Sequence, residues 1–119
     1  MNKKILIVDD DRDILEAIQI ILEREHFNTI TTFRGEEIYK ITGHFRPDLI
    51  LLDVLISGSD GRILSQKLKN DKKTKKIPIV MMSAHPSIAK NYNSFGANDF
   101  IAKPFETEEL LHIIEKNLQ

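Results

Sequence analysis

The run Leu49–Asp53 constrains the fold more than any other segment of the chain. Four consecutive apolar residues end in a carboxylate, Pro47 precedes them, and a loop with Gly58 and Gly61 follows. A run this short, with turn residues on both sides, predicts a strand buried on both faces rather than part of a buried helix. Asp53 then lies where a central strand leaves its sheet, the edge at which open parallel sheets bind ligands. From this segment alone, a functional carboxylate and an ordinary turn cap are about equally favoured.

Other segments have the composition of strands, and helical patterns alternate with them. Besides Leu49–Asp53, the expected strands are Ile5–Val8, Thr29–Thr32, Ile77–Met82 and Asp99–Ala102. The expected helices cover about 12–23, 34–42, 61–70, 87–95 and 108–118. Strict alternation of strands and helices, with nearly continuous apolar strands, predicts a parallel sheet with helices on both faces. The expected fold is therefore α/β, a single doubly wound (βα)5 domain over residues 1–119.

The boundaries of the helices can also be predicted. Gly43 and Gly96 are expected to end two of them, and Thr107 is a candidate N-cap for the last. The half-polar strand Thr29–Thr32 suits an edge of the sheet better than its centre. The side chains that helix 61–70 is expected to bury are Ile63, Leu64 and Leu68.

Composition narrows the classes of partner. The chain has 119 residues, 41% of them hydrophobic, and a net charge of −1, which gives no general reason to expect nucleic acid or an anionic membrane as partner. Cysteine is absent, which excludes disulfides and thiolate metal sites. No signal peptide or membrane-spanning stretch is visible, so we expect a cytoplasmic protein without membrane contact.

The segment Lys67–Lys76 holds six lysines. A nucleic-acid patch is one interpretation, but no aromatic residue is interleaved and Asp71 interrupts the run. A solvated loop is the favoured interpretation.

Polar residues follow four of the predicted strands. Asp9 and Asp10 come after the first strand, Asp53 after the third, Ser83 after the fourth and Lys103 after the fifth. Because the carboxyl ends of parallel strands share one edge of a sheet, these groups should converge. Each residue alone is a weak signal, whereas the convergence of four strand ends is a strong one.

Crowded carboxylates need a counter-charge. Two of them about 4 Å apart repel by roughly 4 kcal/mol at an effective dielectric constant of about 20. Oxygen ligands favour Mg²⁺, with Mn²⁺ as an alternative, and Mg²⁺ bound in this way commonly also holds a phosphoryl oxygen. With Lys103 and Ser83 nearby, the site suits phosphoryl transfer, and a carboxylate can act as the phosphoryl acceptor.

The chain resembles the receiver domains of two-component response regulators from about Lys3 to Leu118. The motifs that carry the resemblance are Val-Asp-Asp after the first strand, Leu-Leu-Asp after the third, Ser-Ala after the fourth and Phe-Ile-Ala-Lys-Pro-Phe after the fifth. The resemblance implies the strand order 2-1-3-4-5.

The resemblance also implies a role for each matched residue. Asp53 matches the phosphorylated aspartate, and Asp9 and Asp10 match the acidic pair that binds Mg²⁺. The backbone carbonyl of Leu55 falls where the family supplies a further metal ligand, and Gly61 matches a glycine eight residues past the acceptor. The residues matched to the phosphoryl contact and the switch are Ser83, Lys103 (whose bond to Pro104 is typically cis in the family) and Phe100.

Two features depart from the family pattern or add to it. Ser57 stands where the family usually has proline, which predicts a more flexible loop before Gly58. Leu55 and His85 flank the approach to the acceptor, and we expect them to shield the phosphoryl group from water.

By the same resemblance, the partners are a histidine kinase or phosphotransfer protein and a downstream protein target. The target would bind the face formed by helix 87–95, strand 99–102 and the last helix, without direct binding of nucleic acid by this chain. A phosphorylation-dependent homodimer is also allowed. The protein would catalyse only its own phosphorylation and dephosphorylation.

Other interpretations of the pattern are weaker. A flavodoxin-like binder needs a phosphate-cradling loop after the first strand, where this chain has Asp9 and Asp10. A haloacid-dehalogenase-like phosphatase needs an acid at the position of Leu55. The more serious alternative is a degenerate receiver that acts as a phosphorylation-independent interaction module.

Overall fold

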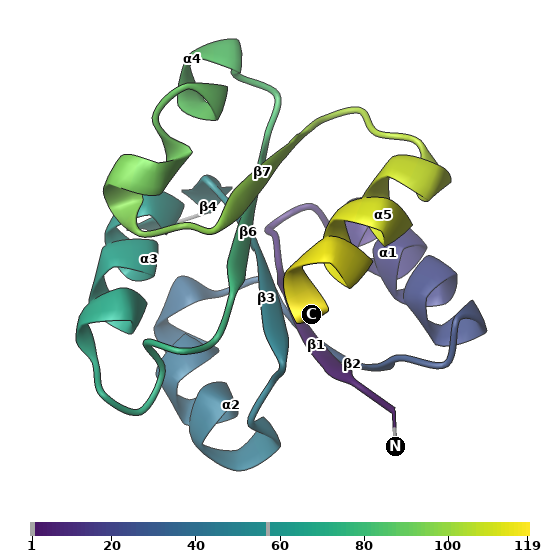
Figure 1. Ribbon diagram of the computed structural model, residues 1–119, viewed down its shortest axis with the longest axis horizontal. Coiled ribbons are helices and arrows are strands. Elements are labelled where there is room, and N and C mark those ends of the chain that lie inside the picture. The colour runs from purple at the N-terminus through teal and green to yellow at the C-terminus, as the bar shows by residue number, and fades with distance from the viewer. Residues whose placement is uncertain (1, 57) are drawn as a thin grey trace.

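Five parallel strands form the central sheet, in the order β2-β1-β3-β6-β7 (Figure 1). They are β1 (Lys4–Val8), β2 (Asn28–Thr32), β3 (Leu49–Asp53), β6 (Ile79–Ser83) and β7 (Asp99–Ala102). The computed structural model describes residues 2–56 and 58–119. Because β6 and β7 are the fourth and fifth strands of this sheet, the order confirms the predicted 2-1-3-4-5 topology, with the half-polar β2 at an edge.

Helices cover both faces of the sheet (Figure 1). On one face lie α1 (Arg12–Arg24) and α5 (Thr107–Leu118). On the other lie α2 (Ile38–Phe45), α3 (Gly61–Asn70) and α4 (Pro86–Ala89), together with the 3-10 turns η1 (Gly35–Glu37) and η2 (Tyr92–Phe95). The predicted fold class is therefore confirmed.

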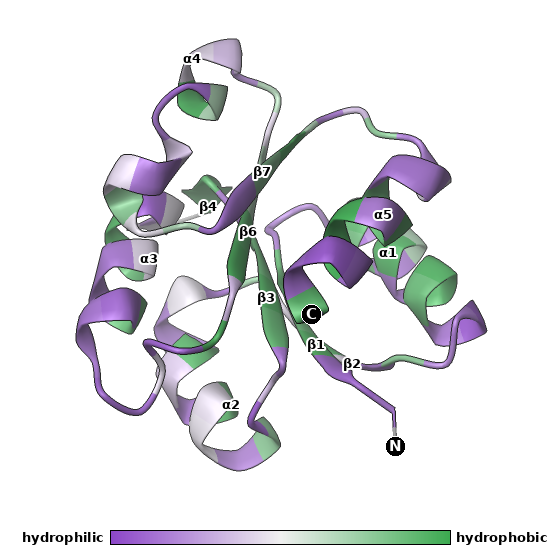
Figure 2. Cartoon of the chain, viewed as in Figure 1, coloured by the Kyte–Doolittle hydropathy of each residue, from purple (hydrophilic) through white to green (hydrophobic). Residues whose placement is uncertain are grey.

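Alternate residues of each central strand enter opposite halves of the core. In β1, Ile5 and Ile7 pack on the side of α1 and α5, while Leu6 and Val8 pack on the side of α2 and α3. Both faces of the sheet are buried from solvent, so the central strands are hydrophobic at nearly every position, as Figure 2 shows for the centre of the sheet. This double burial explains the uninterrupted apolar run before Asp53.

The predicted end of the second helix is wrong. Helix α2 runs through Gly43 and ends at Phe45, and its C-cap is Arg46 in the left-handed region, at φ 53° and ψ 66°. Pro47 disfavours the right-handed helical conformation for the residue before it, so the reversal falls at Arg46. Gly43 is an ordinary helical position with open space where a side chain would be.

Three other local predictions also differ from the structure. Ile63 is 51% exposed, because α3 turns only Leu64 and Leu68 of the predicted set toward the core. The helix expected over 87–95 is broken between α4 and η2, although Gly96 ends it as predicted, at φ 81°. The N-cap of α5 is Glu106, which exchanges hydrogen bonds with Glu109 in a capping box.

A short antiparallel hairpin, β4 (Leu55–Ile56) and β5 (Ser59–Asp60), follows β3 and was not predicted. Ser57, at which the flexible loop was predicted, lies outside the described residues. Within residues 2–56 and 58–119, no helix has the length and apolar character needed to cross a membrane.

Candidate functional site

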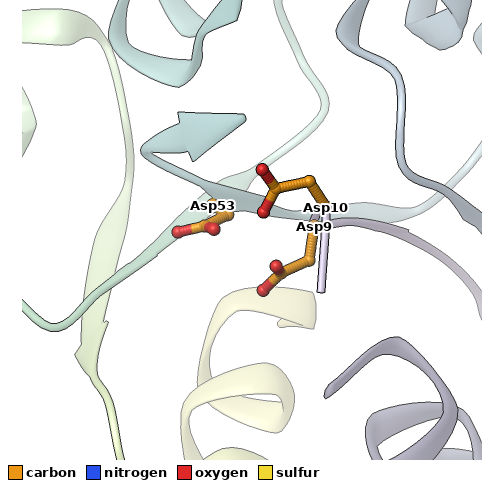
Figure 3. Close-up of side chains that lie close together, drawn as sticks. All are labelled: Asp9, Asp10 and Asp53. Atoms are coloured by element: carbon orange, nitrogen blue, oxygen red, sulfur yellow. The ribbon is translucent and has the colours of Figure 1, made fainter. Parts of the chain in front are cut away.

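Three carboxylates meet at the carboxyl edge of the sheet. Asp9 and Asp10 follow β1, and Asp53 is the last residue of the neighbouring strand β3 (Figure 3). One oxygen from each lies within 4.8 Å of the others. The predicted convergence of these strand ends is thus present, and Asp11, the next acid in the chain, instead caps α1 by accepting from the amides of Asp13 and Ile14.

Lys103 joins the two buried members of this cluster. Asp9 is fully buried and Asp53 is 7% exposed, whereas Asp10 is exposed. Lys103 Nζ donates to Asp9 Oδ2 at 2.6 Å and lies 3.3 Å from Asp53 Oδ2. Its backbone is fixed beside β6, because its amide donates to the carbonyl of Ser83 at 3.0 Å, and its bond to Pro104 is cis. One ammonium group therefore contacts both buried carboxylates and offsets only part of their charge.

The protonation equilibria reflect this crowding. Burial and the neighbouring charge of Asp9 raise the pKa of Asp53 from 3.8 to about 6, against the opposing effect of Lys103. Burial alone would lower the pKa of Lys103, but the hydrogen bond to Asp9 and the charges of both carboxylates raise it. Lys103 is consequently charged at neutral pH, and the acidic cluster still carries more negative than positive charge.

Ser83 and Phe100 lie on the adjacent strands. Ser83 ends β6, one residue beyond the partner of Asp53 in the strand register. Its side chain is buried, and Oγ accepts the backbone N–H of His85 at 3.0 Å. Phe100 in β7 is half-buried and packs against the core on the α2 and α3 side.

Gly61 sets the distance between β3 and α3. A Cβ at this position would collide with the backbone carbonyl of Asp53 and lie 2.9 Å from Val54 Cα. The Gly61 amide donates to the Val54 carbonyl at 2.8 Å. Any side chain here would have to displace the backbone that carries Asp53.

Sequence reasoning missed Asp60 and Arg62. Asp60 caps α3 through the amide of Arg62 and also binds the Arg62 guanidinium, at 2.8 to 3.1 Å. With Asp10 and the 54% exposed Leu55, Asp60 lines a hollow beside the carboxylates. An aspartate directly before a predicted helix is an N-cap pattern, and that signal could have identified it.

The donor set fits a hard divalent cation. All three clustered side chains offer oxygen ligands, one of them exposed on the open side of the cluster. Such ligands suit Mg²⁺, which keeps several waters and takes few protein carboxylates. In the described part of the chain this is the one cluster of three or more metal-ligating side chains.

Residues 5–115 match the response regulator receiver domain family, so the chain belongs to that family. Its members are signalling domains of two-component systems that can be phosphorylated, rather than enzymes acting on an external substrate.

Relatives agree with this assignment. The chain is 36% identical over 116 residues to the heme response regulator HssR of Staphylococcus epidermidis, covering 96% of this chain and 50% of that protein. It is 34% identical over 110 residues to the DNA-binding dual master transcriptional regulator RpaA of Synechocystis, covering 91% and 46%. A crystal structure of a putative response regulator from Chloroflexus aurantiacus superposes with a TM-score of 0.94 at 32% identity, covering 99% and 98%. The chain thus spans about half the length of the curated relatives it matches.

Proposed function

We propose that Asp53 accepts a phosphoryl group from a phosphohistidine on a histidine kinase or phosphotransfer protein. The observation that carries this proposal is the contact of Lys103 with both Asp9 and Asp53 beside the exposed Asp10. An Asp53 oxygen attacks phosphorus, the bond from phosphorus to the imidazole nitrogen breaks, and the imidazole leaves with a proton from solvent. The product is an acyl phosphate on Asp53.

Asp9, Asp10 and Asp53 would hold Mg²⁺, with the carbonyl of Leu55 as a further ligand. Bound there, Mg²⁺ would neutralise charge that the carboxylates and the phosphoryl oxygens share. Asp9 orients Lys103, and Lys103 supplies a mobile positive charge for a phosphoryl oxygen. Mn²⁺, the alternative predicted from the sequence, has no separate support.

Ser83 is the proposed link between phosphorylation and a partner-binding face. Its hydroxyl would turn from the His85 amide to donate to a phosphoryl oxygen. Phe100 would then repack, and since it has no hydroxyl, its effect is one of packing alone. The affected surface is formed by α4, β7 and α5, and phosphorylation would bias its binding to a downstream protein or to a second copy.

Exposure to acetyl phosphate with and without Mg²⁺, followed by intact mass, tests the proposal. We expect one phosphoryl adduct that requires Mg²⁺ and is absent in Asp53→Asn. Asp13→Asn, an exposed carboxylate in the first turn of α1, is the matched control and should be modified normally. An adduct that survives Asp53→Asn would refute the acceptor assignment, and no adduct at all would favour the degenerate receiver.

We further propose that Leu55 and His85 lengthen the lifetime of the acyl phosphate. Both are exposed beside the acceptor, and Leu55 lines the hollow next to Asp10. Leu55→Asn should speed the loss of the phosphoryl group, measured by intact mass over time. An unchanged rate would exclude the shielding role.

The output of the whole protein is also a matter of proposal. RpaA is named as DNA-binding, and this chain covers 46% of it. We place partner binding on the face of α4, β7 and α5 and assign no direct nucleic-acid contact to residues 1–119.

A further inference from the structure

A groove runs along α2 at the amino edge of the sheet, opposite the carboxylates. One part is a cavity of about 520 Å³ lined by Thr42, Gly43, Arg46, Pro47, Lys73 and Ile77. A second part, about 250 Å³, lies beside Tyr39 and Asp71. Both parts are lined by Thr42, Gly43 and Lys73, so they form one elongated depression between α2 and the turn that follows α3.

Two residues near the C-terminal end of α2 depart from local backbone preferences at this groove. Gly43 lies inside the helix, where glycine costs about 0.5–1 kcal/mol relative to alanine, and a Cβ there would meet nothing within 4 Å. Arg46 has the left-handed conformation that favours glycine, at φ 53°. Pro47 accounts for the position of the reversal at Arg46, whereas no described atom lies close enough to position 43 to require a glycine there. Local departures of this kind gather where a surface binds something.

The opposite wall is held in place by the chain itself. Thr74 Oγ1 donates to the carbonyl of Leu68 at 2.6 Å, and the Lys75 amide donates to that of Asp71 at 2.8 Å. Lys69 Nζ donates to the carbonyl of Ile77 at 2.7 Å, and burial lowers its pKa. The prediction of a solvated segment is therefore wrong for Lys69, which has a structural role. The turn that Lys69 helps to hold places Lys73 at the groove in a fixed position.

The charge of the groove favours an anionic occupant. Arg46 and Lys73 line the larger cavity, and the exposed Lys72, Lys75 and Lys76 belong to the same turn. Among the described residues that line the depression, Asp71 is the one carboxylate, and it lies at the Tyr39 end. Burial raises the pKa of Tyr39, and the charge of Asp71 adds to the effect, so the hydroxyl remains protonated and can donate.

Shape distinguishes a peptide from a small anion. From Tyr39 to Arg46 the helix advances about 10 Å, enough for about three residues of extended chain. In an extended chain alternate side chains point the same way, so acidic residues two apart would both face the cations. Gly43 leaves room for a backbone to approach α2 at the middle of the groove.

We propose that this groove binds a short, extended acidic segment of a protein partner, with its carboxylates on Arg46 and Lys73. This site is independent of phosphorylation at Asp53 and lies at the other edge of the sheet. The groove suits an acidic peptide better than nucleic acid, because Tyr39 is the one aromatic side chain among its described lining residues and the net charge of the chain is −1.

The test is a titration of the ¹⁵N-labelled protein with acetyl-Glu-Ala-Glu-Ala-amide, followed by backbone amide shifts. We expect saturable shifts confined to residues 39–47 and 71–77, and none with acetyl-Lys-Ala-Lys-Ala-amide. Arg46→Gly should weaken binding about tenfold, the equivalent of one lost charge-assisted contact, although glycine suits this backbone better. Gly43→Ala should weaken binding by filling the groove, and Lys90→Ala, an exposed lysine at the end of α4, should leave it unchanged.

Several outcomes would overturn the proposal. These are shifts that persist in both Arg46→Gly and Gly43→Ala, shifts centred on Asp9 and Asp10, or no shifts at all. Equal shifts with citrate would indicate a small-anion site, and tighter binding of a thymidine decanucleotide would indicate nucleic acid. Asp53→Asn should bind the peptide normally, so failure here is distinguishable from failure of the phospho-acceptor assignment.

Discussion

The two edges of the sheet carry opposite charge and are built in opposite ways. At the carboxyl edge, Asp9 and Asp53 are buried against one lysine, and the strand ends themselves place the groups. At the amino edge, Arg46 and Lys73 lie on an open groove and are placed by a helix end and a turn. The carboxyl edge therefore brings buried groups of like charge together, whereas the amino edge contains residues that depart from local backbone preferences.

The two edges differ in the kind of free energy that destabilises the folded protein. Crowded carboxylates cost electrostatic free energy that a cation or a proton can recover. A glycine inside a helix and an arginine in the left-handed region each carry a backbone conformational penalty. Only a substitution or a bound partner can offset that penalty. Substitutions at the two edges should therefore respond to different variables: pH and Mg²⁺ at one, peptide at the other.

The largest effect is expected from Lys103→Met. It leaves Asp9 and Asp53 buried without their counter-charge, which should lower the free energy of unfolding by about 3–5 kcal/mol at neutral pH. Urea unfolding in EDTA measures it, and added Mg²⁺ should restore part of the loss. Lys116→Met is the matched control, because Lys116 is 63% exposed in its pair with Asp99. There the loss should stay below about 1 kcal/mol. Equal losses in the two variants would contradict the contrast.

Asp53→Asn should stabilise the metal-free protein. Folding raises the pKa of this carboxyl to about 6, so its contribution to stability is fully present below pH 3.8 and is lost as the pH rises through about 6. At pH 7 the variant should be more stable than the parent by up to about 3 kcal/mol, and the difference should fade by about pH 4. Urea unfolding in EDTA from pH 4 to 7 checks this. A difference that does not change with pH would contradict it.

The sequence predicted the carboxyl edge well because the signals there are local. An apolar run and the acid that ends it are adjacent in the chain, and the parallel sheet brings such ends together; the strand order itself was implied by the family resemblance. The amino edge was predicted poorly. Whether α2 stops at Gly43 or Arg46 depends on Pro47 and on packing. From the sequence alone, a glycine inside a helix cannot be distinguished from a glycine that ends one.

Other misses have the same origin. The exposure of Ile63 depends on how α3 is rotated against the sheet, which three apolar residues in one helix do not determine. The hairpin β4 and β5 has two residues in each strand, too few to show an alternating pattern. Sequence patterns thus predicted the elements, while tertiary packing determined their rotation and their ends.

A matched pair of glycine substitutions compares the two edges directly. Gly61→Ala should destabilise the protein by about 2 kcal/mol, because its Cβ would collide with the backbone of Asp53 and α3 would have to move. It should also slow phosphorylation by acetyl phosphate, since the acceptor strand shifts with it. Urea unfolding and intact mass measure the two effects. Normal stability and a normal phosphorylation rate would show that α3 does not set the position of Asp53.

Gly43→Ala makes the same chemical change at the amino edge and should have the opposite sign. The position is helical and open, so alanine should raise the free energy of unfolding by about 0.5–1 kcal/mol. Phosphorylation of Asp53 should be unchanged, because position 43 lies at the opposite edge of the sheet and a Cβ there meets nothing within 4 Å. Urea unfolding of Gly43→Ala beside the parent measures the gain. A loss of stability would mean that Gly43 is required by the fold. Its presence in α2 would then no longer support the proposed binding groove.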